Sequence, residues 1–151
     1  MVYDLGCYCT TMILSLVDAE LIMVKAVAEM TDEGVDASTA AIMKFANGVR
    51  AAFNVGMVLG NNARYDRLYI RGTKGSIVSP VEYNQTGHLT FDVISEGVKR
   101  VVEVDAPNNY QLEVENLSRA IMGEDKPHIT PEFSLKNGKL LDTILDEIGF
   151  N

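Results

Sequence analysis

The stretch that decides the fold is ASTAAIMKFANGVRAAFNVGMVL, residues 37–59. Apolar and polar side chains alternate through Ala37–Ala46, a period that places neighbouring side chains on opposite faces of a strand. They alternate again through Val49–Leu59, and Asn47-Gly48 stands between the two runs. Both residues of that pair tolerate the positive φ that a two-residue hairpin turn requires. The stretch therefore predicts a long antiparallel hairpin.

Strand-like runs also lie on both sides of this hairpin. Leu21–Met30 alternates with the same period just before it. Four shorter runs follow it, separated by segments rich in Gly, Pro and Asn. These runs are Arg67–Arg71, Ser76–Ser79, Leu89–Ser95 and Val98–Val104. We expect them to form the rest of a mostly antiparallel sheet.

Helical periodicity appears at both ends of the chain. Near the N-terminus, Asp4 stands where an N-cap would, before an apolar stripe of Leu5, Tyr8, Cys9, Met12, Ile13, Leu16 and Val17. Tyr110–Ile121 predicts a helix that ends before Gly123, and Thr130-Pro131 predicts the start of another. This last helix would turn six apolar side chains inward: Phe133, Leu140, Leu141, Ile144, Leu145 and Ile148.

The order of these segments predicts the fold class. A helix, a series of antiparallel strands and two further helices suit an α+β two-layer sandwich, with helices packed on one face of a mostly antiparallel sheet. At 151 residues the chain is long enough for one such domain, and we find no linker inside it. The exposed face of the sheet would carry Lys25, Lys44, Arg50, Asn54 and Tyr69 among apolar neighbours. That face is either solvated or a subunit interface, and the pattern leaves both open.

Composition and charge exclude several classes of partner. The net charge is −8 and the basic residues are scattered, so we expect no nucleic-acid partner. The apolar run of residues 5–17 is too short to cross a bilayer and follows no basic segment, which predicts a soluble, cytoplasmic protein. Cys7 and Cys9 lie too close together for a good disulfide and have no companion ligands for zinc. We therefore predict no metal site.

Familiar cofactor and catalytic motifs are also absent from the sequence. It contains neither G-x-G-x-x-G nor a P-loop, and neither a serine nucleophile elbow nor H-E-x-x-H. No cofactor-binding residue is predicted in this chain. Four polar residues are weaker candidates for a pocket, although solvated positions are the default for them: Asn54, Arg64, Arg67 and Tyr69.

The segment that contains the candidate catalytic residues is DLGCY, residues 4–8. Asp4 and Tyr8 are four residues apart, so a helix would place a carboxylate beside a phenol. Such a pair can relay a proton to a substrate hydroxyl or carbonyl, but a phenol with a pKa near 10 needs a nearby cation to do so at neutral pH. The alternative reading is structural, with Asp4 as a helix cap and Tyr8 as a core residue.

The same segment resembles the D-x-G-x-[H/Y] motif that opens the C-terminal domain of the glucose–fructose oxidoreductase/inositol dehydrogenase/rhizopine catabolism (Gfo/Idh/MocA) family of NAD(P)-dependent oxidoreductases. Four later segments resemble family motifs in the same order. They are DEGVD with FANG (32–36 and 45–48), LYIRGTKGS (68–76), NYQLEVENL (109–117) and the closing helix within 127–142. The resemblance thus extends over nearly the whole chain.

The resemblance implies a division of roles. Asp4 would orient and Tyr8 would transfer the proton as catalytic residues, and Thr11 matches a substrate-contacting position that is often Asp or Asn in relatives. The family's catalytic Lys lies in an E-K-P segment upstream of Met1, and its nucleotide loop lies further upstream. NAD or NADP would therefore belong to a full-length parent, and we expect this chain alone to bind neither.

Two functional hypotheses follow. In the first, residues 1–151 are the C-terminal substrate-binding and oligomerisation domain of an NAD(P)-dependent oxidoreductase acting on a sugar, polyol or diol. Its partners would be the small-molecule substrate, the missing N-terminal Rossmann domain and a second copy bound through the sheet face, and the chain alone would be inactive. In the second, it is a stand-alone, non-catalytic binding or assembly module that lacks a cofactor.

Overall fold

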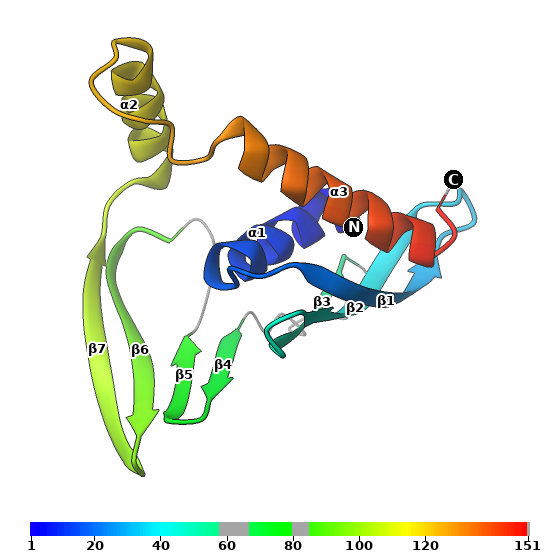
Figure 1. Cartoon of the computed structure of the whole chain (residues 1–151), viewed down its shortest axis with the longest axis horizontal. Helices are drawn as coiled ribbons and strands as arrows, with labels where there is room; N and C mark the ends of the chain where they lie inside the picture. Colours follow the sequence, from blue (N-terminus) through cyan, green and yellow to red (C-terminus); the bar gives the residue numbers. More distant parts are fainter. Residues whose placement is uncertain (58–66, 80–84, 151) are drawn as a thin grey trace. The chain divides into compact units, whose positions relative to one another are not determined.

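The computed structural model describes residues 1–57, 67–79 and 85–150 (Figure 1). The chain divides into two compact units, Met1–Asn62 with Ile129–Asn151, and Ala63–His128. Every strand pairing in the described residues is antiparallel, and helices pack against a sheet. The predicted α+β class is therefore confirmed. Among the described residues, the helices are too short or too polar to span a bilayer.

The first unit contains a three-stranded sheet in the order β1-β2-β3. Its strands are β1 (Leu21–Met30), β2 (Asp36–Phe45) and β3 (Arg50–Gly56). Gly48 has a φ of 86°, and the Phe45 amide donates to the Val49 carbonyl at 2.9 Å, so the chain reverses at Asn47-Gly48. The predicted hairpin is confirmed as far as residue 57, and Leu59 lies outside the described residues.

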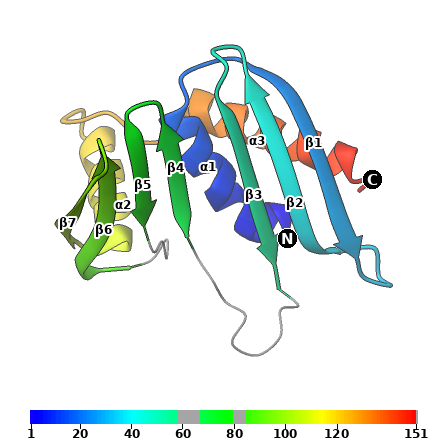
Figure 2. The same ribbon diagram turned by 90° about the horizontal axis from the view of Figure 1, so that it is seen from below.

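Three helical segments cover one face of this sheet (Figure 2). A π-helical turn, η1 (Val2–Gly6), continues into α1 (Cys7–Leu16), and α3 (Pro131–Glu147) lies beside them. The Thr130 hydroxyl accepts from the Phe133 amide at 3.2 Å, as expected of the predicted N-cap. The six side chains predicted to face inward from α3 do so: Leu140, Leu141, Ile144 and Leu145 are buried, and Phe133 and Ile148 pack against the core.

The first helix differs from its prediction in start and phase. It begins at Val2, and Asp4 is not the N-cap but an exposed residue within the π-helical turn. The buried positions are Val2, Gly6, Thr10 and Leu14, whereas Tyr8 on the predicted stripe is 44% exposed. A Cβ at Gly6 would lie 3.7 Å from the Phe53 ring, so small residues let the helix approach the sheet closely. The side of the helix that is buried is therefore the side that can lie closest to the sheet, and not the side with the most apolar residues.

The second unit contains a four-stranded sheet in the order β4-β5-β6-β7, followed by one helix. The elements are β4 (Leu68–Gly72), β5 (Gly75–Ser79), β6 (Gly87–Ser95), β7 (Val98–Ala106) and α2 (Asn109–Ile121). All five lie within two residues of the predicted segments. The Asn108 side chain caps α2, and Gly123 follows its end with a φ of 76°, as predicted.

Candidate active site

Asp4, Tyr8 and Thr11 lie on one continuous helix, in η1 and α1. Asp4 and Tyr8 are exposed, and Thr11 is half-buried. Since Val2, Gly6, Thr10 and Leu14 form the buried side, the spacing of the three candidates places them together on the opposite side of the helix. Tyr8 is thus not a core residue, and Asp4 is not a cap. Both structural alternatives considered for the pair are wrong.

The turn that carries Asp4 is wider than an α-helical turn. The Met1 carbonyl accepts from the amides of Leu5 at 2.9 Å and Gly6 at 3.1 Å, with the Asp4 amide at 3.2 Å. A single π-helical turn within an α-helix is uncommon and is often found at functional sites. Nothing in the apolar periodicity of the sequence indicates this turn.

Asp36 holds the beginning of this helix from the start of β2. Its carboxylate accepts from the Met1 α-ammonium at 2.6 Å, the Val2 amide at 2.7 Å and the Thr39 hydroxyl at 2.9 Å. The Asp36 side chain is only 5% exposed. Burial on its own would raise the pKa of Asp36, but these hydrogen bonds outweigh it and the pKa lies below its usual value. The carboxylate therefore stays charged beside the positive end of the helix dipole.

Asn137 of α3 contacts Thr11, the candidate substrate-binding residue. Its Nδ2 donates to the Thr11 Oγ1 at 3.0 Å, which fixes the position of that hydroxyl. The Asn137 Oδ1 is buried and has no hydrogen-bond partner within the described part of the chain. The sequence did not predict a role for Asn137. Its one unusual feature is a polar amide among the mostly apolar inward-facing positions of the last helix.

Two other titratable side chains of this helix, Cys7 and Tyr3, have raised pKa values. Burial raises the pKa of the Cys7 thiol, which donates to the Asp4 carbonyl at 3.2 Å, so Cys7 is a neutral thiol at pH 7. The Tyr3 hydroxyl donates to Asp142 Oδ1 at 3.0 Å, and this bond raises the pKa of Tyr3. Asp4 lies one helical turn from Tyr8 on the exposed side of this helix.

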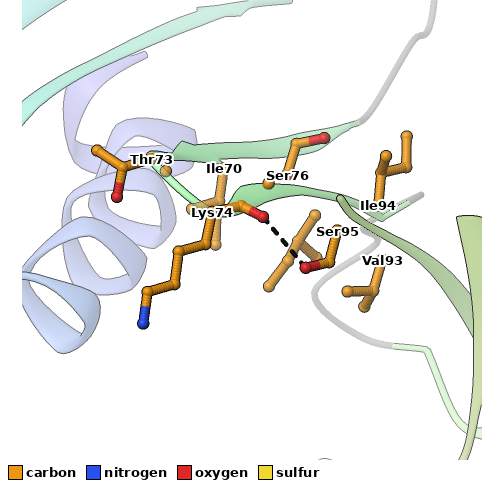
Figure 3. Close-up of a pocket in the computed structure, with 10 residues that line it drawn as sticks. Ile70, Thr73, Lys74, Ser76, Val93, Ile94 and Ser95 are labelled. Atoms are coloured by element: carbon orange, nitrogen blue, oxygen red, sulfur yellow. Dashed lines mark hydrogen bonds between the residues drawn. The ribbon is translucent and has the colours of Figure 1, made fainter. Parts of the chain in front are cut away.

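A separate open cavity of about 410 Å³ lies at the β4–β5 turn of the second unit (Figure 3). Its lining includes the apolar Ile70, Ile77 and Val93, with Lys74 as its one charged residue. The Ser95 hydroxyl donates to the Lys74 carbonyl at 3.1 Å and ties the turn to β6. The described residues that line the cavity include no carboxylate, His or Tyr.

Three of the four weaker polar candidates lie in the described residues, and they are divided between the two units. Arg67 and Tyr69 are in the second unit and do not line its cavity, and Arg64 lies outside the described residues. Asn54 is on the exposed side of β3 in the first unit. Tyr69 instead accepts from the Arg71 guanidinium at 3.3 Å, which lowers the pKa of Tyr69.

Two kinds of site, a metal cluster and a Rossmann-type dinucleotide site, can be compared with the described residues. They include no group of three or more His, Cys, Asp or Glu side chains placed to hold a metal ion. A dinucleotide site of the Rossmann type needs parallel strands joined by a helix. The strand pairs in the described ranges are all antiparallel, so these elements cannot build one.

Comparison with solved structures finds the same fold in part of several larger proteins. UDP-N-acetylglucosamine 3-dehydrogenase GnnA from Acidithiobacillus ferrooxidans superposes with a TM-score of 0.84 at 18% identity, over 97% of this chain and 46% of that one. The 3-ketoreductase KijD10 from Actinomadura kijaniata, solved with NADP, gives 0.83 at 18% identity, over 97% and 47%. An NAD-binding protein from Listeria innocua gives 0.73 at 22% identity, over 99% and 45%.

This chain thus spans slightly less than half the length of these relatives. A search of curated protein sequences finds no match. The family model described as the GFO/IDH/MocA C-terminal domain matches residues 1–78, which include η1, α1, the first sheet, β4 and all of β5 except Ser79. This chain therefore belongs to the Gfo/Idh/MocA family and corresponds to its C-terminal domain.

Proposed function

We propose that this chain is the substrate-binding half of an NAD(P)-dependent oxidoreductase, with Tyr8 as the proton-transferring residue. The observation that carries the proposal is the placement of Asp4, Tyr8 and Thr11 on one side of a helix that is held at its beginning by Asp36 and at Thr11 by Asn137. A solvated phenol and carboxylate on a rigid element suit contact with a small molecule. A purely structural role would not need them there.

In this proposal each side chain has one task. Tyr8 Oη exchanges a proton with a substrate hydroxyl or carbonyl, Asp4 orients that group, and the Thr11 hydroxyl, held by Asn137, binds the substrate. A cation from another part of the enzyme would assist this proton transfer. The nicotinamide, bound by the parent's other half, supplies hydride chemistry. The described residues of this chain contribute shape and the proton.

The substrate class we propose is a sugar, polyol or diol. Two of the structural relatives are a UDP-N-acetylglucosamine 3-dehydrogenase and a 3-ketoreductase, the latter also solved with TDP-benzene and NADP. Both names describe oxidation or reduction at carbon 3. These relatives are under 20% identical to this chain, so they support the choice of first substrates to test, namely nucleotide-linked hexoses and their 3-keto forms.

The first experiment is to measure the mass of the native polypeptide with an antibody raised against this chain. We expect a product about twice as large, because a Rossmann domain adds roughly 120–150 residues. A product of the mass of this chain, 16.6 kDa, would instead support the stand-alone module.

In the larger product, Tyr8→Phe should abolish turnover and leave folding intact. Tyr3→Phe is the matched control, because Tyr3 is an exposed tyrosine of the same helix whose hydroxyl is committed to Asp142. Equal activity of the two variants would contradict the role proposed for Tyr8.

We also propose that this chain alone binds neither NAD nor NADP. A titration of micromolar chain with NADH should leave the cofactor fluorescence unchanged. Saturable enhancement or quenching of that fluorescence would contradict the assignment of the nucleotide site to the other half.

Finally, we propose that the uncovered face of the β1-β2-β3 sheet binds a second copy of the chain. That face is free of helices within its own unit (Figure 2) and carries exposed apolar side chains. Such a patch is more typical of an interface than of a solvated surface.

A further inference from the structure

One hydrogen bond with a defined direction joins α1 to α3. The two helices lie side by side over the first sheet (Figure 1). Asn137 Nδ2 of α3 donates to Thr11 Oγ1 of α1 at 3.0 Å. An amide NH2 group can only donate, so the Thr11 oxygen is the acceptor in this bond. The hydroxyl hydrogen of Thr11 is therefore not used between the two helices.

Other hydroxyl groups of α1 donate their hydrogen to a carbonyl of the same helix. Thr10 donates to the Cys7 carbonyl at 3.1 Å. Ser15 donates to the Thr11 carbonyl at 2.8 Å. Such bonds to the preceding turn are common for Ser and Thr inside a helix. The Thr11 hydroxyl differs, because its bond with Asn137 is the only one that it makes within the described residues.

The Asn137 amide has the less costly of its two possible orientations. Its Oδ1 is buried and has no partner in the part of the chain that the structure describes. Turned over, the amide would accept from Thr11 through Oδ1 and would place its NH2 group, with two donors, at the buried position. Unpaired N–H groups are rarer in protein interiors than unpaired carbonyl oxygens. The observed orientation therefore keeps Thr11 as the acceptor.

We propose that Asn137 is a positioning residue that keeps the hydroxyl hydrogen of Thr11 available for donation to the substrate. Thr11 is half-buried, so part of its side chain is open to a bound molecule. The substrate then needs an acceptor oxygen at this point, which a carbonyl, an ether or a hydroxyl can supply. This inference rests on the substrate contact proposed above for Thr11 and adds the direction of the hydrogen bond, which selects among substrates.

The spacing along α1 indicates which substrate oxygen this is. Thr11 follows Tyr8 by three residues, which puts their Cβ atoms about 5–6 Å apart on one side of the helix. The oxygen that Thr11 binds is therefore on a carbon close to the one that reacts beside Tyr8. In a sugar or polyol the neighbouring carbons carry oxygens, whereas a simple alcohol has none there. The contact thus favours a substrate with oxygens on adjacent carbons.

The test is a double-mutant cycle on kcat/KM in the full-length parent, assayed with the nucleotide-linked hexose that it turns over fastest. Thr11→Val removes the hydroxyl and keeps the shape, and we expect kcat/KM to fall about tenfold, mainly through KM. Asn137→Leu should cause nearly the same fall, because the Thr11 hydroxyl then donates to a carbonyl of its own helix. In the Thr11→Val background, Asn137→Leu should change kcat/KM less than about twofold.

Matched variants and analogues separate this role from a structural one. Thr11→Ser keeps the hydroxyl and should retain nearly wild-type kcat/KM. Asn137→Leu also removes the unpartnered Oδ1, so the urea midpoint of this chain should change little. Lys136→Ala, at an exposed neighbour on α3, is the control and should leave kcat/KM unchanged. A deoxy hexose without the oxygen next to the reacting carbon should lose about tenfold with the wild type and nothing further with Thr11→Val.

The outcomes distinguish this inference from the proposed function. If Thr11→Val leaves kcat/KM unchanged, Thr11 does not bind the substrate, and both its proposed contact and this inference are overturned. If Thr11→Val lowers kcat/KM and Asn137→Leu does not, the contact stands and the role of Asn137 is overturned. A fall caused by Asn137→Leu that is equally large in both backgrounds also overturns that role. Similar single losses that do not add, with activity retained in Thr11→Ser, support it.

Discussion

Removing the Asp36 carboxylate should release the helix that carries Asp4, Tyr8 and Thr11. In Asp36→Ala the Val2 amide and the Thr39 hydroxyl, which lie 2.7 and 2.9 Å from that carboxylate, lose their acceptor in a buried place. A buried donor left without its acceptor costs about 1–3 kcal/mol, so the two together cost about 2–6 kcal/mol. The whole free energy of unfolding of a domain is about 5–15 kcal/mol, so the loss is a large part of it.

The measurement is urea unfolding at pH 7, followed by circular dichroism. Asp32→Ala is the control, because Asp32 is an exposed carboxylate in the turn just before β2. Asp36→Asn keeps the shape but not the charge, and we expect it to lose about 2 kcal/mol. A loss below about 1 kcal/mol in Asp36→Ala, with unchanged denaturant dependence, would refute the view that Asp36 holds the helix.

The same carboxylate predicts a pH dependence of stability. The pKa of Asp36 is lowered in the folded chain, so its contribution is fully present above the unfolded pKa of about 3.9. It is lost as the pH falls through the folded pKa. The stability difference between the wild type and Asp36→Asn should therefore be constant from pH 7 to about pH 5 and shrink below about pH 4. A difference that stays constant in acid would contradict this assignment.

Two further substitutions test the core and the second sheet. Ile144→Ala removes a side chain that is 0% exposed and should cost about 2–5 kcal/mol in urea unfolding, whereas Leu135→Ala, 67% exposed on the same helix, should cost little. Gly75→Ala would place a Cβ 2.0 Å from the Ile94 carbonyl oxygen, so β5 and β6 must separate, and we expect faster hydrogen exchange along both strands. Gly72→Ala meets its nearest backbone atom at 3.8 Å and should leave exchange unchanged.

Most of the architecture could be predicted because its signals are local. The Asn47-Gly48 turn and the alternation around it place β2 and β3 within a few residues of their observed bounds. Thr130, followed by proline and then by inward apolar positions, is enough to place α3 and its buried side. Each of these features depends on neighbours in sequence, which is what periodicity and turn chemistry report.

The details of the candidate site could not be predicted in the same way. The first helix is apolar on nearly every side, so periodicity could not fix its phase, and the small Gly6 and Thr10 are buried because the helix lies close to the sheet. Its beginning is held by Asp36, 34 residues from Val2, and Thr11 is held by a residue 126 positions away. Contacts at such separations leave no pattern in a single sequence.

The contacts of Asp36 with Val2 and of Asn137 with Thr11 lie entirely within the first unit. Asp36 and Asn137 both belong to the same unit as the helix, so its orientation is set before any other part of a larger enzyme docks onto it. Recombination that joined this unit to a different nucleotide-binding half would transfer Asp4, Tyr8 and Thr11, the side chains that we propose contact the substrate, as one group. Substrate choice and cofactor choice would then be inherited separately, and each could change without rebuilding the other.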